Sequence, residues 1–421
     1  MKVHVICTLI ALTSGGVLLG VGPASAATAA GSLDTTFGAG GKVLTNLNGQ
    51  MPSDAVLQAN GDILVGVSGG GAFGVLRYLP SGSLDTSFGS DGYAQVVPAS
   101  VGGQTSVVVT TRALAVQPNG QIVLGGDVSS LSGQVVDVGA ARFNANGTVD
   151  TSFGTGGMAT TPVFAPSAGF ASETTDAVVV QANGDILLGT SASQTSYHAE
   201  VTTGAVVRYT SAGVLDAGFG SGGVVVSQSL GDVRTLGVDA SGDVFVLPSA
   251  VELSAAGQFD ASVQAAPIVA SSQGGGYAFL ADGQYVAAES VGAGKHNDEV
   301  EAVRFNAGGA VDPTFDSVLL HYSGTGSSQD SAGSITVASG GQIVFGGSQF
   351  LGTSVFGVAQ VDANGAVDSA FGTGGAVTTD FQGDDSVAAV LVEPNGDIVA
   401  VGSSENNSTG QVDVALVRYV G

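Results

Sequence analysis

The sequence predicts an all-β fold, a seven-bladed β-propeller, and three observations lead to this prediction. The first is a Gly-x-(Leu/Val/Phe)-Asp motif that recurs along the chain, at Gly31, Gly82, Gly147, Gly213, Gly257, Gly309 and Gly365. The second is a pair of β-rich runs around a tight turn, which recurs within these repeats. The third is composition: 68 of 421 residues are Gly and 44% are hydrophobic, which indicates a chain that turns often and can still bury a core.

The first two strands of each repeat are predicted from a hairpin. In its fullest form, residues 180–189, two β-rich runs flank Asn183-Gly184. Asn-Gly favours a tight primed turn, because both residues accept a positive φ. Related runs occupy residues 58–66, 117–125 and 393–401. A parallel β-helix is the alternative architecture, but it would have shorter rungs without hairpin turns.

The third and fourth strands are predicted from two further motifs. A short run ending in Arg and an aromatic residue, such as Arg142-Phe143, is the third strand. The stretch after Phe-Gly-x-Gly-Gly, such as residues 42–47 or 376–380, is the fourth. Each repeat thus provides four antiparallel strands, arranged as one blade.

These motifs resemble the delta-60 repeat family of bacterial secreted and surface proteins, and the resemblance covers essentially all of residues 31–421. It implies a propeller fold and implies little about activity. Two repeats depart from the pattern. The fifth, at residues 258–263, lacks the Phe-Gly pair, and the sixth has Asp316 in place of the glycine, so the motifs do not fix the blade boundaries there.

Ring closure is predicted from the order of the strands. The chain begins with a fourth strand and ends with a third, so residues 31–49 would complete a blade made by residues 387–419. Such a mixed blade removes an unpaired edge. In four repeats an Arg precedes an Asp by eight residues: Arg77–Asp85, Arg142–Asp150, Arg208–Asp216 and Arg304–Asp312. By closure, Asp34 is the expected ion-pair partner of Arg418, although a solvated Arg on each strand is the alternative.

The first 26 residues are predicted to be a signal peptide, and residues 27–421 a single propeller domain. Lys2 precedes an apolar run from Val5 to Leu19, and Ala24-Ser25-Ala26 has the small-x-small pattern of a cleavage site after Ala26. A transmembrane anchor is the alternative, but the run is short for a span of about 20 residues. We therefore expect a secreted, extracellular protein without membrane insertion.

Charge and cysteine content exclude several functions. With 35 acids against 10 bases, the formal net charge is −25. Nucleic-acid binding depends on Lys and Arg neutralising phosphates, so this class is excluded. The one cysteine, Cys7, lies in the predicted signal peptide, which leaves the mature chain without disulfides, thiol catalysis or cysteine-bound metal.

Candidates for metal binding are few. The densest group of metal-ligating residue types is His296, Asp298, Glu299 and Glu301, in a predicted loop between the second and third strands of the fifth repeat. A solvated polar loop is the alternative interpretation. No twelve-residue Ca²⁺ loop and no strand-to-helix nucleophile elbow is present in the sequence. We therefore expect no cofactor, with Ca²⁺ as the one weak candidate.

A second set of candidates lies at the start of the first strands, beside the expected central channel. The first four repeats place Asp54, Arg112, Asp176 and Arg234 there, if a one-residue gap is allowed for Asp54. The alternation of sign fits inter-blade ion pairs, and it equally fits a polar recognition site at the channel mouth.

The variable loops identify a candidate binding face. From the hairpin glycine to the next repeat there are 29 residues after Gly184 and 15 after Gly242. Variable loops on one face of a repeat protein often mark its binding surface. The sequence thus favours a monomeric binding or scaffold module for a protein or glycan partner. The alternatives are a propeller enzyme, a lyase or lactonase-like hydrolase with a divalent metal at the channel mouth, and a purely structural surface repeat.

Overall fold

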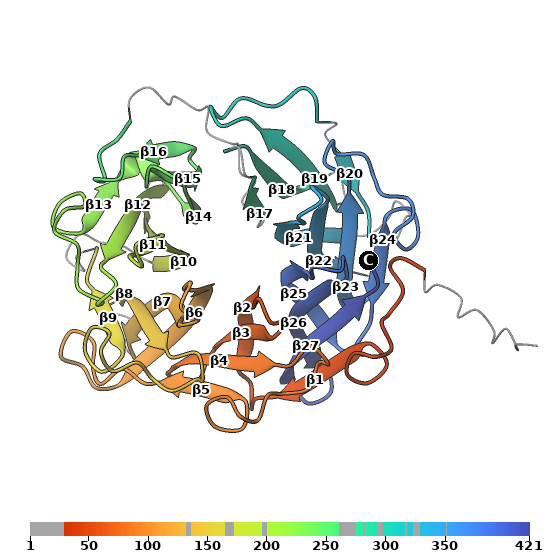
Figure 1. The fold of residues 1–421 in the computed structure, drawn as a ribbon, viewed down its shortest axis with the longest axis horizontal. Helices are drawn as coiled ribbons and strands as arrows, with labels where there is room; N and C mark the ends of the chain where they lie inside the picture. The colour runs from red at the N-terminus through yellow and green to blue at the C-terminus, as the bar shows by residue number, and fades with distance from the viewer. Residues whose placement is uncertain are drawn as a thin grey trace, which may run out of the picture.

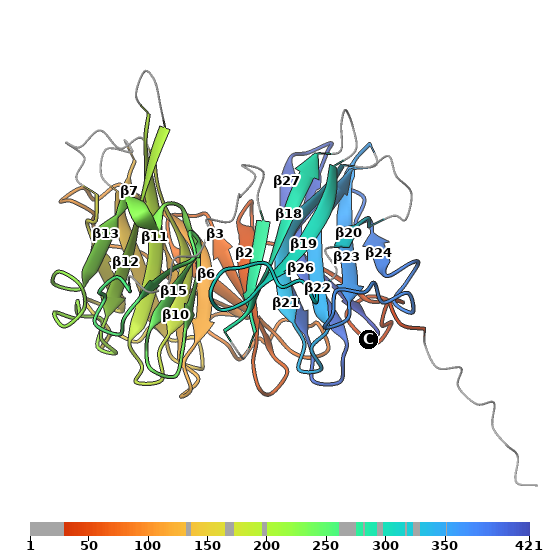
Figure 2. The ribbon, with the colours of Figure 1, turned by 90° about the horizontal axis from the view of Figure 1, so that it is seen from above.

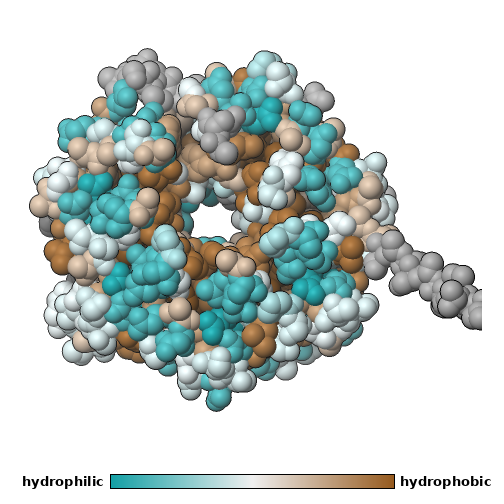
Figure 3. Space-filling model, in the orientation of Figure 1, coloured by the Kyte–Doolittle hydropathy of each residue, from teal (hydrophilic) through white to brown (hydrophobic). Residues whose placement is uncertain are grey.

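The computed structural model describes residues 29–131, 136–164, 172–195, 200–260, 275–280, 283–292, 298–315, 318–322, 329–350 and 352–421. Their strands form seven blades around a central opening (Figure 1), and the space-filling view shows this channel passing through the ring (Figure 3). The predicted seven-bladed propeller is therefore confirmed. Residues 1–26, with Cys7, lie outside the described residues.

Each blade is antiparallel and runs from an innermost to an outermost strand. Blade 1 contains β2 (Met51–Leu57), β3 (Ile63–Ser68), β4 (Phe73–Tyr78) and β5 (Tyr93–Val96). Blade 2 contains β6 (Val107–Val116), β7 (Ile122–Ser130), β8 (Val136–Phe143) and β9 (Met158–Thr161). Blade 3 contains β10 (Ser172–Val180), β11 (Ile186–Thr195), β12 (Glu200–Tyr209) and β13 (Val224–Ser227).

Blade 4 differs, because its described residues form three strands: β14 (Val233–Val238), β15 (Val244–Pro248) and β16 (Val251–Leu253). Blade 5 contains β17 (Gly275–Phe279), β18 (Tyr285–Gly292), β19 (Asp298–Phe305) and β20 (Val318–Leu320). Blade 6 contains β21 (Gln329–Val337), β22 (Ile343–Phe350), β23 (Ser354–Val361) and β24 (Ala376–Thr379). Within the described ranges, no helix is long and apolar enough to cross a bilayer.

Blade 7 closes the ring as predicted. It contains β25 (Asp384–Val392), β26 (Ile398–Asn406) and β27 (Gln411–Tyr419), and its outermost strand is β1 (Lys42–Asn46). β1 pairs antiparallel with β27, from Lys42 opposite Val417 to Asn46 opposite Asp413. The two ends of the chain therefore share one sheet, and β27 has no free edge.

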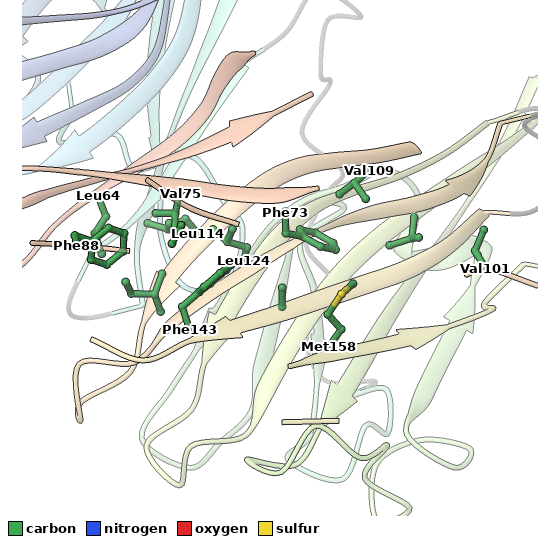
Figure 4. Packing of buried hydrophobic residues seen from close by; sticks show 14 residues of the cluster. Leu64, Phe73, Val75, Phe88, Val101, Val109, Leu114, Leu124, Phe143 and Met158 are labelled. Atoms are coloured by element: carbon green, nitrogen blue, oxygen red, sulfur yellow. The ribbon is translucent and has the colours of Figure 1, made fainter. Parts of the chain in front are cut away.

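The hydrophobic core lies between neighbouring blades. In Figure 4, Leu64 and Phe73 of blade 1 face Leu114, Leu124 and Phe143 of blade 2, all within one buried cluster. The phenylalanines of the recurring Asp-x-x-Phe motif are also buried: Phe37, Phe88, Phe153, Phe219, Phe315 and Phe371. These aromatic residues therefore stabilise the fold and are not exposed platforms for a ligand.

In five of the seven blades, the recurring arginine joins the blade to the next one. Arg142 Nε donates to Asp150 Oδ2 at 2.8 Å within blade 2, and its Nη1 donates to the carbonyl of Ser211 in blade 3. Its guanidinium lies 4.7 Å from the ring centroid of Phe153. We call this three-part contact the arginine clamp. It recurs, with the carbonyl acceptor last, as Arg77–Asp85–Ala145, Arg208–Asp216–Ala255, Arg304–Asp312–Ala363 and Arg418–Asp34–Pro80.

A glycine reinforces the clamp and explains why the Phe-Gly motif is needed. Gly154 has a φ of +52°, which other residues rarely adopt, and its N–H donates to the carbonyl of Ala212 in blade 3 at 2.8 Å. Burial alone would raise the pKa of Asp150, but hydrogen bonds from Ser152 and Arg142 outweigh it and hold this pKa below its ordinary value. The clamp carboxylates are therefore ionised at neutral pH.

Two blades, 4 and 6, lack this arginine. At the arginine position blade 4 has Glu252. Its backbone carbonyl accepts a hydrogen bond from Asp260 N, as the carbonyl of Arg142 does from Asp150 N in blade 2. Burial raises the pKa of Glu252, and so do the nearby acids Asp260, Asp243 and Asp239. Blade 6 has Gln360 at the same position, but there Gly372 N still donates to Ala30 O in blade 7.

Replacing Glu252 with Arg is therefore expected to stabilise the protein. The new guanidinium would face Asp260 and the carbonyl of Ala307, which corresponds to Ala363 in blade 6. A partly exposed pair contributes up to about 1 kcal/mol, or roughly 2 °C in melting temperature. Differential scanning calorimetry measures the change, with Glu252→Gln as the control that only removes repulsion. An Arg variant no more stable than the Gln variant would show that no clamp forms.

Candidate functional site

The channel wall carries a β-bulge at the same point of most innermost strands. In six of the seven, the pairing with the second strand skips one residue. The extra residues are Ser53, Arg112, Asp176, Arg234, Gly333 and Ala388. Bulges redirect side chains and are common beside functional sites. Blades 2 to 4 carry charged residues at this position, whereas blades 6, 7 and 1 carry Gly, Ala and Ser.

Arg112 is the most available cation of this wall. Its Nε lies 3.6 Å from Asp127 Oδ2 and its Nη1 lies 3.8 Å from Asp176 Oδ1. Both distances are longer than the donor–acceptor distance of a hydrogen bond, and 41% of the Arg112 side chain is exposed. Its N–H groups are thus attracted to the two carboxylates but not saturated by them.

Arg234 is held more tightly. Its Nε donates to Asp232 Oδ2 at 2.7 Å, and Asp232 Oδ1 accepts a bond from Ser191 Oγ in blade 3 at 3.0 Å. Ser191 Oγ in turn accepts from Val233 N at 3.2 Å. This network fixes Arg234 at the boundary of blades 3 and 4 while leaving 31% of its side chain exposed.

Asp54 does not occupy the bulge position that Arg112, Asp176 and Arg234 occupy, so the predicted alignment of these four residues is wrong at Asp54. The extra residue of β2 is Ser53, and Asp54 pairs with Gly66 one position later. Its carboxylate accepts from Leu114 N in β6 and from Ala55 N, both at 2.8 Å. Ser334 plays the same part in blade 6, where its hydroxyl accepts from Val390 N at 3.1 Å. Asp54 therefore links two blades by satisfying a backbone N–H.

The wall is more acidic than the sequence pattern suggests. Burial raises the pKa of Asp176 to about 6, and Asp127 and Asp232 act in the same direction against the attraction of Arg112 and Arg234. Burial, and then repulsion by Asp127 and Asp137, raises the pKa of Glu173 to about 8. No sequence motif marks Asp127 in β7, Glu173 in β10 and Asp232 just before β14, because their positions do not repeat.

Half of the predicted metal cluster cannot be placed. His296 lies outside the described residues, and of Asp298 only the backbone is described. Glu299 Oε1 lies 3.3 Å from His321 Nε2, and Glu301 pairs with Glu289 across β19 and β18. In the part of the chain that the structure describes, no three His, Cys, Asp or Glu side chains are placed to hold a metal ion.

The face with the variable loops has a low point at blade 4. β11 and β12 are ten residues long, whereas β15 has five and β16 has three. Figure 2 shows β11 rising well above β15 on this face. The difference in height agrees with the loop lengths in the sequence and lies beside the charged wall of blades 2 to 4.

Three segments of the chain match one protein-family model. The family is described as a domain of unknown function (DUF5122) β-propeller, and the matched residues are 58–88, 117–153 and 181–219. Each segment runs from an inner hairpin to the Asp-x-x-Phe motif. The match supports a β-propeller repeat family. No curated protein matches the chain.

Several solved structures are similar to this chain at low identity. Virginiamycin B lyase from Staphylococcus aureus, in a catalytically inactive form with quinupristin, is 10% identical with a TM-score of 0.46, over 89% of this chain and 99% of that one. Polysaccharide lyase Uly1 is 11% identical with a TM-score of 0.45, over 90% and 98%. A protein of unknown function from Dyadobacter fermentans is 12% identical with a TM-score of 0.42, over 75% and 98%. These similarities carry no information on the activity of this chain.

Proposed function

We propose that the protein is a secreted β-propeller binding module of the delta-60 repeat family, with its recognition site on the charged channel wall of blades 2 to 4. One observation carries the proposal. Arg112, Asp176 and Arg234 occupy the extra position of consecutive inner strands, whereas the other bulged strands have Ser, Gly or Ala there. A fold that needed only the bulge would not require charges on one side of the channel.

The chemistry of the wall favours a glycan as the ligand. Arg112 offers N–H donors that are not saturated, and Asp176 offers an acceptor 3.8 Å away. Adjacent hydroxyl groups of a sugar both donate and accept hydrogen bonds, so they match such a pair. Ligand sites combine a few convergent polar groups with a concave, largely preformed surface, which the channel mouth provides.

The test is the double variant Arg112→Ala/Arg234→Ala, probed on an array of bacterial and plant glycans. The variant is expected to bind the glycan selected by the native protein at least tenfold more weakly, equivalent to about 1.4 kcal/mol. The matched control is Ser53→Ala/Ala388→Ser, which exchanges the small residues at the same bulge position of blades 1 and 7 and is expected to bind normally.

Thermal melting of both variants separates binding from stability. Loss of folding in the Arg double variant, without any glycan bound by the native protein, would assign these residues to inter-blade stability and refute the proposal. A ligand on a protein array and none on the glycan array would redirect it to a protein partner.

A further inference from the structure

Two cavities lie at equivalent places between neighbouring blades. One, of about 520 Å³, is between blades 2 and 3, and the other, of about 710 Å³, is between blades 6 and 7. Each is lined by a threonine and a tyrosine whose hydroxyls share a hydrogen bond, Thr161 with Tyr209 at 2.6 Å and Thr379 with Tyr419 at 2.7 Å. Both cavities therefore arise from the repeat itself.

The larger cavity differs in having polar residues on its inner wall. Gln349 and Tyr322 line it, and both are buried. Gln349 lies two residues after Gly347 in β22. The same position is occupied by Val128 in blade 2, two residues after Gly126, and by Ala192 in blade 3, two residues after Thr190. Since blades 2 and 3 fold with apolar residues there, a buried amide at this position is not a requirement of the fold.

Gln349 is held in place by a buried network. Its Nε2 donates to Asp330 Oδ1 at 3.0 Å, and Asp330 Oδ2 accepts from Tyr322 N at 3.3 Å. His321 Nδ1 lies 3.7 Å from the same oxygen. The amide group is thereby oriented with its nitrogen toward Asp330. Gln349 Oε1 has no hydrogen-bond partner among the described residues, although Gln349 is 0% exposed.

An unpaired buried carbonyl is unfavourable, and native structures rarely retain one without a reason. Here the residue that carries it lines a cavity in the size range of small-molecule sites. The acceptor calls for an O–H or N–H donor on the ligand. The remaining wall offers the hydroxyls of Thr373 and Thr378, and one charge of each sign, Lys42 and Asp380.

We propose that this cavity binds a neutral saccharide unit, one of whose hydroxyl groups donates to Gln349 Oε1. A balanced pair of charges and several hydroxyls suit a neutral ligand rich in hydroxyl groups. The site lies between the outer strands of blades 6 and 7, separate from the channel wall, so it stands independently of the function proposed above.

The test uses the whole folded chain with D-glucose, D-galactose and N-acetyl-D-glucosamine, measured by saturation-transfer NMR and titration calorimetry. Thr373→Trp fills the cavity from its exposed side, and Gln349→Val introduces the blade 2 residue. Both are expected to weaken binding at least tenfold. Thr155→Trp, at the same motif position in the smaller cavity, and Arg112→Ala/Arg234→Ala are expected to bind as the native protein does.

Several results would overturn the proposal: none of the three sugars binds, Thr373→Trp binds normally, or Thr155→Trp is weakened equally. Loss of sugar binding in Arg112→Ala/Arg234→Ala alone would place the sugar in the channel instead. Should Gln349→Val fail to fold, Thr373→Trp decides the outcome, because Thr373 is exposed and its side chain is dispensable for packing.

Discussion

Deletion of residues 27–49 is expected to lower the melting temperature by about 10 °C or more, or to abolish cooperative unfolding. The deletion removes β1, so β27 loses its antiparallel partner along Lys42–Asn46. It also removes Asp34, whose Oδ2 lies 2.6 Å from Arg418 Nη2. Arg418 is only 10% exposed and would keep, among carboxylates, only its longer contact with Glu393 Oε1, at 3.4 Å. Removing one partner of a buried pair costs roughly 3–5 kcal/mol. Calorimetry of the chain with and without these residues measures the effect.

Point variants separate the ion pair from the strand. Arg418→Ala is expected to cost several kcal/mol, whereas Gln360→Ala, at the same repeat position in blade 6, is expected to cost little. Burial raises the pKa of Asp34, but hydrogen bonds from Thr36 and Arg418 outweigh it and lower this pKa overall. The pair therefore contributes stability above the unfolded pKa near 4, and this contribution is lost as pH falls through the folded value. An unchanged melting temperature after the deletion would refute closure by β1.

The second large effect is expected at Glu173, which lies in β10 near two buried acids, Asp127 and Asp137. Burial and these neighbours raise its pKa from 4.5 to about 8. A carboxyl group with a raised folded pKa costs nothing below its unfolded pKa, and the cost grows as pH rises toward the folded value. At pH 8 this cost is on the order of 4 kcal/mol. Glu173→Gln is therefore expected to raise the melting temperature by several degrees at pH 8 and hardly at pH 5.

The measurement is thermal unfolding of both proteins across this pH range. Glu405→Gln is the matched control, because Glu405 is an exposed residue of β26 and its replacement removes no buried carboxyl group. A stabilisation of Glu173→Gln that is equal at pH 5 and pH 8 would mean that the substitution acts through packing and that Glu173 is ionised throughout.

Much of the fold could be predicted because its determinants are local and recur. Asn183-Gly184 specifies a hairpin within a few residues, but the predicted primed turn is wrong, since only Gly184, at φ +87°, and not Asn183 has a positive φ. The spacing of eight between Arg142 and Asp150 reflects one turn between two strands. Ring closure followed from counting strands at the two ends. Each of these features depends on neighbours in sequence or on a pattern that the chain repeats.

The candidate site was harder to predict because it depends on register and on contacts between blades. A bulge shifts every following residue by one, and only the paired strands show that Ser53 and not Asp54 is the extra residue. The contact of Arg112 with Asp127 and Asp176 joins residues of two blades without any repeated motif. Likewise, Gln349 and Asp330 meet only because β22 lies against β21.

The arginine clamp has a consequence for how such a chain can evolve. Its acceptor in the next blade is a backbone carbonyl, supplied by Ala145, Ser211, Ala255, Ala363 or Pro80. A carbonyl is present whatever the side chain, so a newly duplicated blade can join its neighbours without any matching substitution. Gene duplication can then lengthen the ring first, and selection can afterwards diversify individual blades, as the differences at Glu252, Gln349 and Gln360 illustrate.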